Sequence, residues 1–134
     1  SSGFTDMPMN HKVFLAQFDA IKKLASEGPC VMVGRCADYA LSEYKDCFSV
    51  FVHADTDWRI NRLSQKHNKT AKEAKDMINK TDKSRSSYYN YYTNKKWGAA
   101  SSYNLCVDSS KLGIDGAAKA IIQAIEIFDS IKNK

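Results

Sequence analysis

Long apolar runs are missing from this chain of 134 residues. A membrane-spanning helix needs roughly eighteen consecutive apolar residues, and no stretch approaches that length. The sequence also does not open with the charged-then-apolar pattern of an export signal. We therefore expect a soluble, cytoplasmic protein.

Paired cysteines are missing as well. The four cysteines form no Cys-x-x-Cys pair, and Cys30, Cys47 and Cys106 lie in or at the start of apolar runs, where a thiol acts as a small hydrophobic group. The three histidines show no metal-ligand spacing, and Cys36 has no histidine close in sequence to activate it. We expect reduced thiols, with no disulfide, no metal site and no nucleophile mechanism.

What the chain does contain fits one globular domain that prefers anionic partners. Its length and its 43% hydrophobic content are those of an ordinary domain with a buried core. The 20 Lys and Arg residues exceed the 15 Asp and Glu residues, and the net charge is +5. This balance favours phosphates or nucleic acid without choosing between them.

The spacing of apolar residues predicts helices that alternate with short strands, which is typical of an α/β fold with a parallel sheet. In chain order we expect a loop at 1–10, a helix from His11 to a Gly-Pro stop at 28–29, and a strand at 30–33 that is buried on both faces. A short helix at 37–42 and a strand at 48–52 follow, and then two helices, one capped by Asp55 or Thr56 and one capped by Thr70 with Glu73. The chain should end with a strand at 103–107, a loop at 108–113 and a last helix through Phe128.

The stretch 80–97 combines basic groups, hydroxyls and aromatic rings in a helix-compatible run. It continues a stripe that begins apolar and becomes polar and aromatic at Thr81, through positions 71, 74, 78, 81, 85, 88 and 92. Such a run is too polar for a core helix and too aromatic for a plain surface helix. It fits a segment that grips phosphate or docks on a partner.

Ligands of parallel α/β sheets bind beyond the carboxyl ends of the strands. We therefore expect the loops at 34–38, 54–56 and 108–111 to share one crevice. Arg35 follows the first expected strand, and after the tight turn at Gly34 its guanidinium could clamp an anion. The alternative is that Arg35 is a surface arginine paired with Asp38. If Arg35 binds a ligand instead, Asp38 could orient its guanidinium or contact the ligand itself.

Two further pairs are neighbours on expected helices. Arg59 and Arg62 lie three residues apart and could stack on a base or bind phosphate, or they could form a solvated face. Asp82 and Arg85 have the same spacing and are flanked by Lys80 and Lys83, and these residues alone slightly favour a charged outer face over a binding role. The tyrosines at 88, 89, 91 and 92 are typical of core or interface packing.

Taken together, three motifs resemble the bacterial cytidylate kinase-like family of nucleoside monophosphate kinases. They are Val31-Met32-Val33-Gly34-Arg35-Cys36-Ala37-Asp38, the run Lys80-Thr81-Asp82-Lys83-Ser84-Arg85 leading into the tyrosines, and Trp97-Gly98, and the resemblance extends from about Met9 to about Ile125. It implies a three-layer parallel sheet of P-loop nucleoside monophosphate kinase type, with residues 55–97 as a lid-like helical segment of a single domain at 1–134.

The resemblance also implies an activity, namely ATP-dependent phosphoryl transfer to a cytidylate-like acceptor. Its family pattern assigns roles residue by residue: Arg59, Arg62 and Arg85 to catalysis; Arg35, Asp38, Lys80, Asp82, Lys83, Arg85 and Tyr88 to the acceptor; and Arg59, Arg62, Ser110 and Lys111 to ATP, which acts with Mg²⁺.

One family feature is missing from these residues. The sequence has no Gly-x-x-x-x-Gly-Lys-Ser/Thr loop to cradle the donor phosphates, and in the family that loop follows a central strand. Without that strand, sheet edges would stay unpaired. We therefore expect an N-terminal segment or another chain, such as a second copy, to complete the sheet, and no activity from these residues alone.

A different class of function stays open. A non-catalytic module could hold RNA or single-stranded nucleic acid through the arginines, lysines and tyrosines named above, by phosphate contact and stacking. The ligand-end arginines of an α/β chain favour small nucleotides, and no membrane partner is expected.

Overall fold

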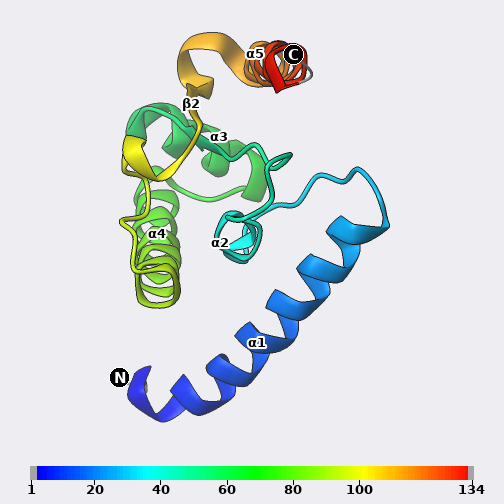
Figure 1. Cartoon of the computed structure of the whole chain (residues 1–134). Helices are drawn as coiled ribbons and strands as arrows, with labels where there is room; N and C mark the ends of the chain where they lie inside the picture. Colours follow the sequence, from blue (N-terminus) through cyan, green and yellow to red (C-terminus); the bar gives the residue numbers. More distant parts are fainter. Residues whose placement is uncertain (1–2, 133–134) are drawn as a thin grey trace. The chain divides into compact units, whose positions relative to one another are not determined.

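The computed structural model describes the backbone of residues 3–132 and the side chains of residues 11–132. The chain is mixed α/β and mostly helical, and it divides after Cys47 into two compact units. Figure 1 shows the order of the elements along the chain. No helix within the described residues is long and apolar enough to cross a membrane.

The N-terminal unit consists of α1 (Gly3–Glu27) and the short α2 (Ala37–Ala40). Its core joins Ile21 of α1 to Ala40 and Leu41, and Phe18 packs against Tyr39 with ring centroids 6.1 Å apart. The predicted stop is confirmed, because α1 ends directly before Gly28 and Pro29. Gly28 has a φ of 151°, a conformation that favours glycine, and proline cannot continue a helix.

Two expectations for this unit are wrong. The segment 3–10 is helical rather than a loop. The helix that is predicted from His11 extends towards the N-terminus, because a single proline near a helix start removes only one hydrogen bond. Ser1 and Ser2 lie outside the described residues. Residues 30–33 form no strand, and Val31 and Val33 are 93% and 90% exposed. An apolar run becomes a strand only where a neighbouring strand pairs with it, and the described chain places none there.

The C-terminal unit is built on two parallel strands. β1 (Val50–His53) pairs with β2 (Leu105–Asp108), so that Val50 lies beside Leu105 and His53 beside Asp108. Both strands lie within two residues of their predicted positions. Two hydrogen bonds link the residues that precede the strands: the Ser49 N–H donates to the Asn104 side chain, and the Asn104 N–H donates to the Ser49 hydroxyl.

Two capped helices follow β1. α3 (Thr56–His67) is capped by Asp55, whose carboxylate accepts from the Trp58 N–H at 3.3 Å. α4 (Ala71–Thr93) is capped by Thr70 in the predicted capping box: the Glu73 N–H donates to the Thr70 hydroxyl, and the Thr70 N–H donates to the Glu73 carboxylate. Because only residues 68–70 separate them, the two helices pack against each other.

The predicted stripe of α4 is correct in its first half and displaced by one residue in its second half. Ala74 and Ile78 are buried as expected. The inward line then runs through Asp82, Ser86, Tyr89 and Thr93, whereas Thr81 and Arg85 are exposed and positions 88 and 92 are half-buried beside that line. Spacings of three and four residues are both compatible with a helix, so the sequence alone could not choose between them.

The last helix, α5 (Ser109–Lys132), starts directly after β2 and therefore replaces most of the loop expected at 108–113. The expected loop is present only as a break in the helix at Gly113, which has the non-helical angles φ 74° and ψ 168°. A short 3₁₀ turn, η1 (Ala100–Ser102), precedes β2. Phe48 packs on Phe128 of α5, with ring centroids 5.2 Å apart.

Candidate functional site

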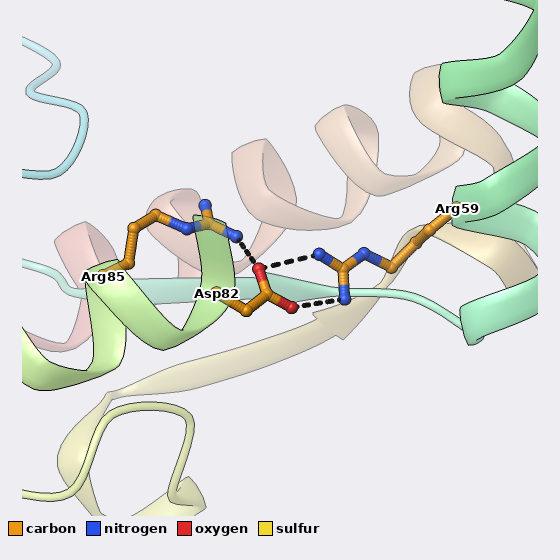
Figure 2. Close-up of polar contacts among 3 residues, drawn as sticks. All are labelled: Arg59, Asp82 and Arg85. Atoms are coloured by element: carbon orange, nitrogen blue, oxygen red, sulfur yellow. Dashed lines mark hydrogen bonds and ion pairs between the residues drawn. The ribbon is translucent and has the colours of Figure 1, made fainter. Parts of the chain in front are cut away.

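Arg59, Asp82 and Arg85 form a salt-bridged group, named here the Asp82 cluster (Figure 2). Arg59 binds Asp82 in a bidentate manner, with Nη1 2.8 Å from Oδ2 and Nη2 2.9 Å from Oδ1. Arg85 Nη2 donates to the same Oδ1 at 2.5 Å. One carboxylate therefore holds two guanidiniums, and the cluster keeps a net charge of +1, from two positive groups and one negative group.

Helix geometry explains how these three residues meet. Asp82 and Arg85 are three positions apart on α4, and such residues face the same side of a helix. Arg59 comes from α3, which the short link brings alongside α4. The side chains of Asp82 and Arg59 are 24% and 29% exposed, whereas that of Arg85 is 54% exposed. The cluster is thus half-buried at Asp82 and Arg59 and open to solvent at Arg85.

The charge state of Asp82 follows from this setting. Partial burial raises the pKa of its carboxyl group, but the hydrogen bonds and charges of Arg59 and Arg85 outweigh that effect and lower the pKa below its ordinary value. Asp82 is therefore ionised at neutral pH, and both guanidiniums are oriented before any ligand arrives.

Each tryptophan lies beneath an arginine. The guanidinium carbon of Arg85 is 4.9 Å from the ring centroid of Trp97, and that of Arg62 is 5.8 Å from the ring centroid of Trp58. The backbone N–H of Trp97 donates to the Asn90 side chain of α4 at 2.7 Å, which ties the loop after α4 to the helix. The cation–π contact therefore holds Arg85 on a second side.

The carboxyl ends of β1 and β2 are joined by hydrogen bonds. Asp108 Oδ1 accepts from the Ser110 hydroxyl at 2.5 Å and from the Ser110 N–H at 2.9 Å, and the Ser110 hydroxyl in turn accepts from the Asp55 N–H at 3.0 Å. These bonds, above all the side-chain bond from Ser110, lower the pKa of Asp108. The two loops expected at this edge therefore do meet. Lys111 is exposed in the first turn of α5.

The third predicted loop belongs to the N-terminal unit. Gly34, Arg35 and Cys36 have φ values of 71°, 57° and 57°, so the backbone turns through three successive left-handed residues before α2 begins. That conformation is uncommon for residues with side chains. Arg35 is exposed, and Asp38 is half-buried in the first turn of α2. Burial, and then the nearby charge of Asp38, raises the pKa of Cys36 to about 11, so this thiol is protonated and unreactive.

The remaining candidates lie along α4. Lys80 and Lys83 are exposed, and Tyr88 is half-buried with its ring 4.8 Å from that of Tyr92. Neither lysine appears among the ion pairs of the Asp82 cluster. Among the described residues, no group of three or more His, Cys, Asp or Glu side chains is placed to hold a metal ion.

Two residues of this region were missed as individual candidates. Trp97 supports Arg85 from a loop, and Asp108 organises the turn after β2. An Asp-Ser-Ser sequence directly after a strand is a signal for the second, because Asp side chains accept hydrogen bonds from the backbone two residues on. No sequence signal could place a ring beneath Arg85 across a twelve-residue separation.

Comparison with known proteins gives two matches. The family model described as "Cytidylate kinase-like family" matches residues 1–111. The crystal structure of an uncharacterized protein from Eubacterium ventriosum superposes on this chain with a TM-score of 0.83, and the two sequences are 33% identical. The match covers 87% of this chain and 74% of the Eubacterium chain. No curated protein matches the sequence.

Proposed function

The chain belongs to the cytidylate kinase-like family, and from this membership we propose that it serves ATP-dependent phosphoryl transfer to a nucleoside monophosphate with a cytidylate-like base. The observation that carries the proposal is the Asp82 cluster, in which two arginines from successive helices are already paired and oriented. Phosphoryl transfer depends on such positioned positive groups rather than on a protein nucleophile.

The catalytic role falls to Arg59, Arg62 and Arg85. Arginine forks bind phosphate oxygens in a bidentate manner, and they neutralise the charge that spreads over the transferred group. Arg62 additionally lies over the Trp58 ring, which is the geometry of a flat cation on an aromatic surface. Arg59 and Arg62 would contact the donor nucleotide, and Arg85 would reach the acceptor.

Each unit carries residues that we propose bind the acceptor. Arg35 projects from a strained turn and would hold the acceptor phosphate, with Asp38 beside it. On α4 of the C-terminal unit, Lys80, Asp82, Lys83 and Tyr88 would contact the acceptor, because they lie within two helical turns of Arg85. Ser110 and Lys111, at the carboxyl end of β2, would meet the adenine edge of ATP.

The proposed function also implies a specific sheet architecture. We propose a three-layer parallel sheet of P-loop nucleoside monophosphate kinase type, with residues 55–97 as the lid, and the parallel β1–β2 pair supports it. A lid that closes over the nucleotides would exclude water as a competing acceptor.

The residues of this chain do not supply every contact that ATP and Mg²⁺ require. The 134 residues contain no Gly-x-x-x-x-Gly-Lys-Ser/Thr sequence, and the described residues offer no group of acidic side chains for a metal. We therefore derive no step through magnesium, and the proposal for this chain covers acceptor, lid and adenine contacts.

The test is diphosphate formation from ATP, Mg²⁺ and a panel of nucleoside monophosphates, with the protein carrying whatever residues precede Ser1 in its gene. We expect turnover with a cytidylate-like acceptor and a loss of about 100-fold in kcat/KM for Arg59→Ala. Lys66→Ala, on the exposed last turn of the same helix, is the control and should keep full activity. If no monophosphate yields a diphosphate, the proposal fails.

The nucleic-acid alternative has one supporting observation, the exposed ring of Tyr91 on a lysine-bearing helix. Against it, Asp82 compensates part of the arginine charge on which a backbone-tracking groove would depend. RNA binding that weakens steeply with added salt, together with no diphosphate formation, would favour this alternative.

A further inference from the structure

Asp82 occupies the end of the Arg59 guanidinium, where the two terminal nitrogens form a fork. Both terminal nitrogens of Arg59 are bound to the carboxylate, at 2.8 and 2.9 Å. A phosphate group presents two oxygens to a guanidinium in the same planar, bidentate way as a carboxylate. In the free protein, therefore, Asp82 already satisfies the fork that the proposed function assigns to phosphate.

Arg85 is bound less completely. It gives Asp82 only Nη2, its side chain is 54% exposed, and its guanidinium carbon lies over the Trp97 ring, 4.9 Å from the centroid. Asp82 and Arg85 share α4, so their spacing is fixed by the helix, whereas Arg59 belongs to α3. An anion can thus first contact Arg85 from solvent and then compete with Asp82 for Arg59.

We propose that Asp82 is an internal substitute for phosphate: it holds Arg59 and Arg85 in place while the site is empty, and a phosphate group of the bound nucleotide displaces it from Arg59. This inference rests on the proposed function and gives Asp82, which is already placed at the acceptor, a second role as a positioning residue. Displacement releases a carboxylate that is then available to a ligand hydroxyl or amine. The same exchange sets a threshold against weakly charged anions, because a ligand must bind Arg59 better than Asp82 does.

The direct test uses inorganic tripolyphosphate as the probe and isothermal titration calorimetry of the present chain. Asp82→Asn keeps the shape of the side chain, removes its charge and raises the net charge of the cluster from +1 to +2. We expect the Asn variant to bind tripolyphosphate at least about fivefold more tightly, since loss of one partly exposed ion pair corresponds to about 1 kcal/mol. Equal or weaker binding would overturn the proposal.

Asp76→Asn is the matched control. Asp76 is exposed on the same helix, outside the Asp82 cluster, and its replacement changes the net charge of the protein by the same amount. We expect its affinity for tripolyphosphate to stay within about twofold of wild type, because exposed charges are screened by salt. A gain as large as that of Asp82→Asn would show a general charge effect and would overturn the proposal.

A second measurement on the wild-type protein does not depend on the folding of any variant. Side-chain NMR can follow the Asp82 carboxyl carbon and the Arg59 Nε–H during a tripolyphosphate titration. Displacement predicts that both signals shift with the same midpoint. A shift of Arg59 with an unmoved Asp82 carboxyl carbon would overturn the proposal. Because no nucleotide is present, these results are independent of whether diphosphate formation is observed.

Discussion

At the scale of single residues, Asp82 shows which contacts a sequence can predict. Its neighbour Arg85 is three positions away on a helix, and that pairing is visible in the sequence. The bidentate contact with Arg59 spans 23 positions and depends on how α3 and α4 pack. Spacing alone left Arg59 as either a ligand residue or part of a solvated face, and its ion pair with Asp82 excludes the purely solvated alternative.

The lowered pKa of Asp82 predicts how the stability of the protein depends on pH. Because Arg59 and Arg85 favour the ionised form in the folded state, the ion pair stabilises the fold above the unfolded pKa of about 3.9. This stabilisation is lost as the pH falls through the folded pKa, which lies lower. We therefore expect the gap in unfolding free energy between wild type and Asp82→Asn, measured by urea denaturation, to shrink between pH 6 and pH 3.

The control for this measurement is again Asp76→Asn, whose gap from wild type should change less between pH 6 and pH 3 than the gap of Asp82→Asn. A gap for Asp82→Asn that does not depend on pH would show that its carboxylate is not stabilised by the arginines. Buffers should avoid phosphate, since the anion could compete for the same guanidiniums.

At the scale of elements, the starts of α3 and α4 were predictable because caps are local. Asp55 and Thr70 accept hydrogen bonds from backbone N–H groups only three residues away, and nothing distant is needed to form them. These two helices carry Arg59 and Asp82. The position of the candidate site along the chain was therefore predictable, although its contacts were not.

The capping box of α4 gives a prediction at this scale. Thr70→Ala removes the hydroxyl that accepts from the Glu73 N–H, so the first turn of α4 loses one bond. We expect the unfolding free energy to fall by about 1 kcal/mol, as measured by urea denaturation. Thr81→Ala is the matched control, because Thr81 is exposed in the middle of α4 and alanine has the higher helix propensity there. A loss for Thr81→Ala as large as that for Thr70→Ala would contradict the capping explanation.

The segment at 30–33 failed as a strand for the opposite reason. Its apolar residues resemble a buried strand, but a strand is defined by a partner that lies elsewhere in the sequence. β1 and β2 were predicted from the same kind of signal and do form, because 50–53 and 105–108 have each other. Short apolar runs thus predict where strands can form and not whether they do.

At the scale of the whole molecule, the family was recognisable from motifs spread over most of the sequence, and the family match over residues 1–111 confirms that identification. The division after Cys47 was not expected. Arg35 and Asp38 lie in the N-terminal unit and the Asp82 cluster in the C-terminal unit, so the two groups of proposed acceptor residues belong to different units. Each can therefore be tested by its own variants.

The exposure of residues 30–33 gives a prediction for the whole chain. Thermolysin cuts before large apolar residues in backbone that can unfold locally, and Val31 and Val33 lie outside any helix or strand. We expect the first cuts in a brief digestion to fall within 30–33, as mapped by mass spectrometry of the fragments. Ile122 and Ile127 are the internal controls: their side chains are also exposed, but α5 holds their backbone, so cleavage there should come later.

The same digestion bears on the proposed three-layer sheet. If residues 30–33 pair with another strand, their N–H and C=O groups are satisfied and the segment is protected from the protease. For the chain of 134 residues, early cleavage within 30–33 is the expected result, and protection there would contradict the exposed segment. Repeating the digestion with any residues that precede Ser1 in the gene, and separately at rising protein concentration, then distinguishes two possible sources of a partner strand. Protection gained from the preceding residues would support a strand of the same chain, and protection gained with concentration would support a second copy.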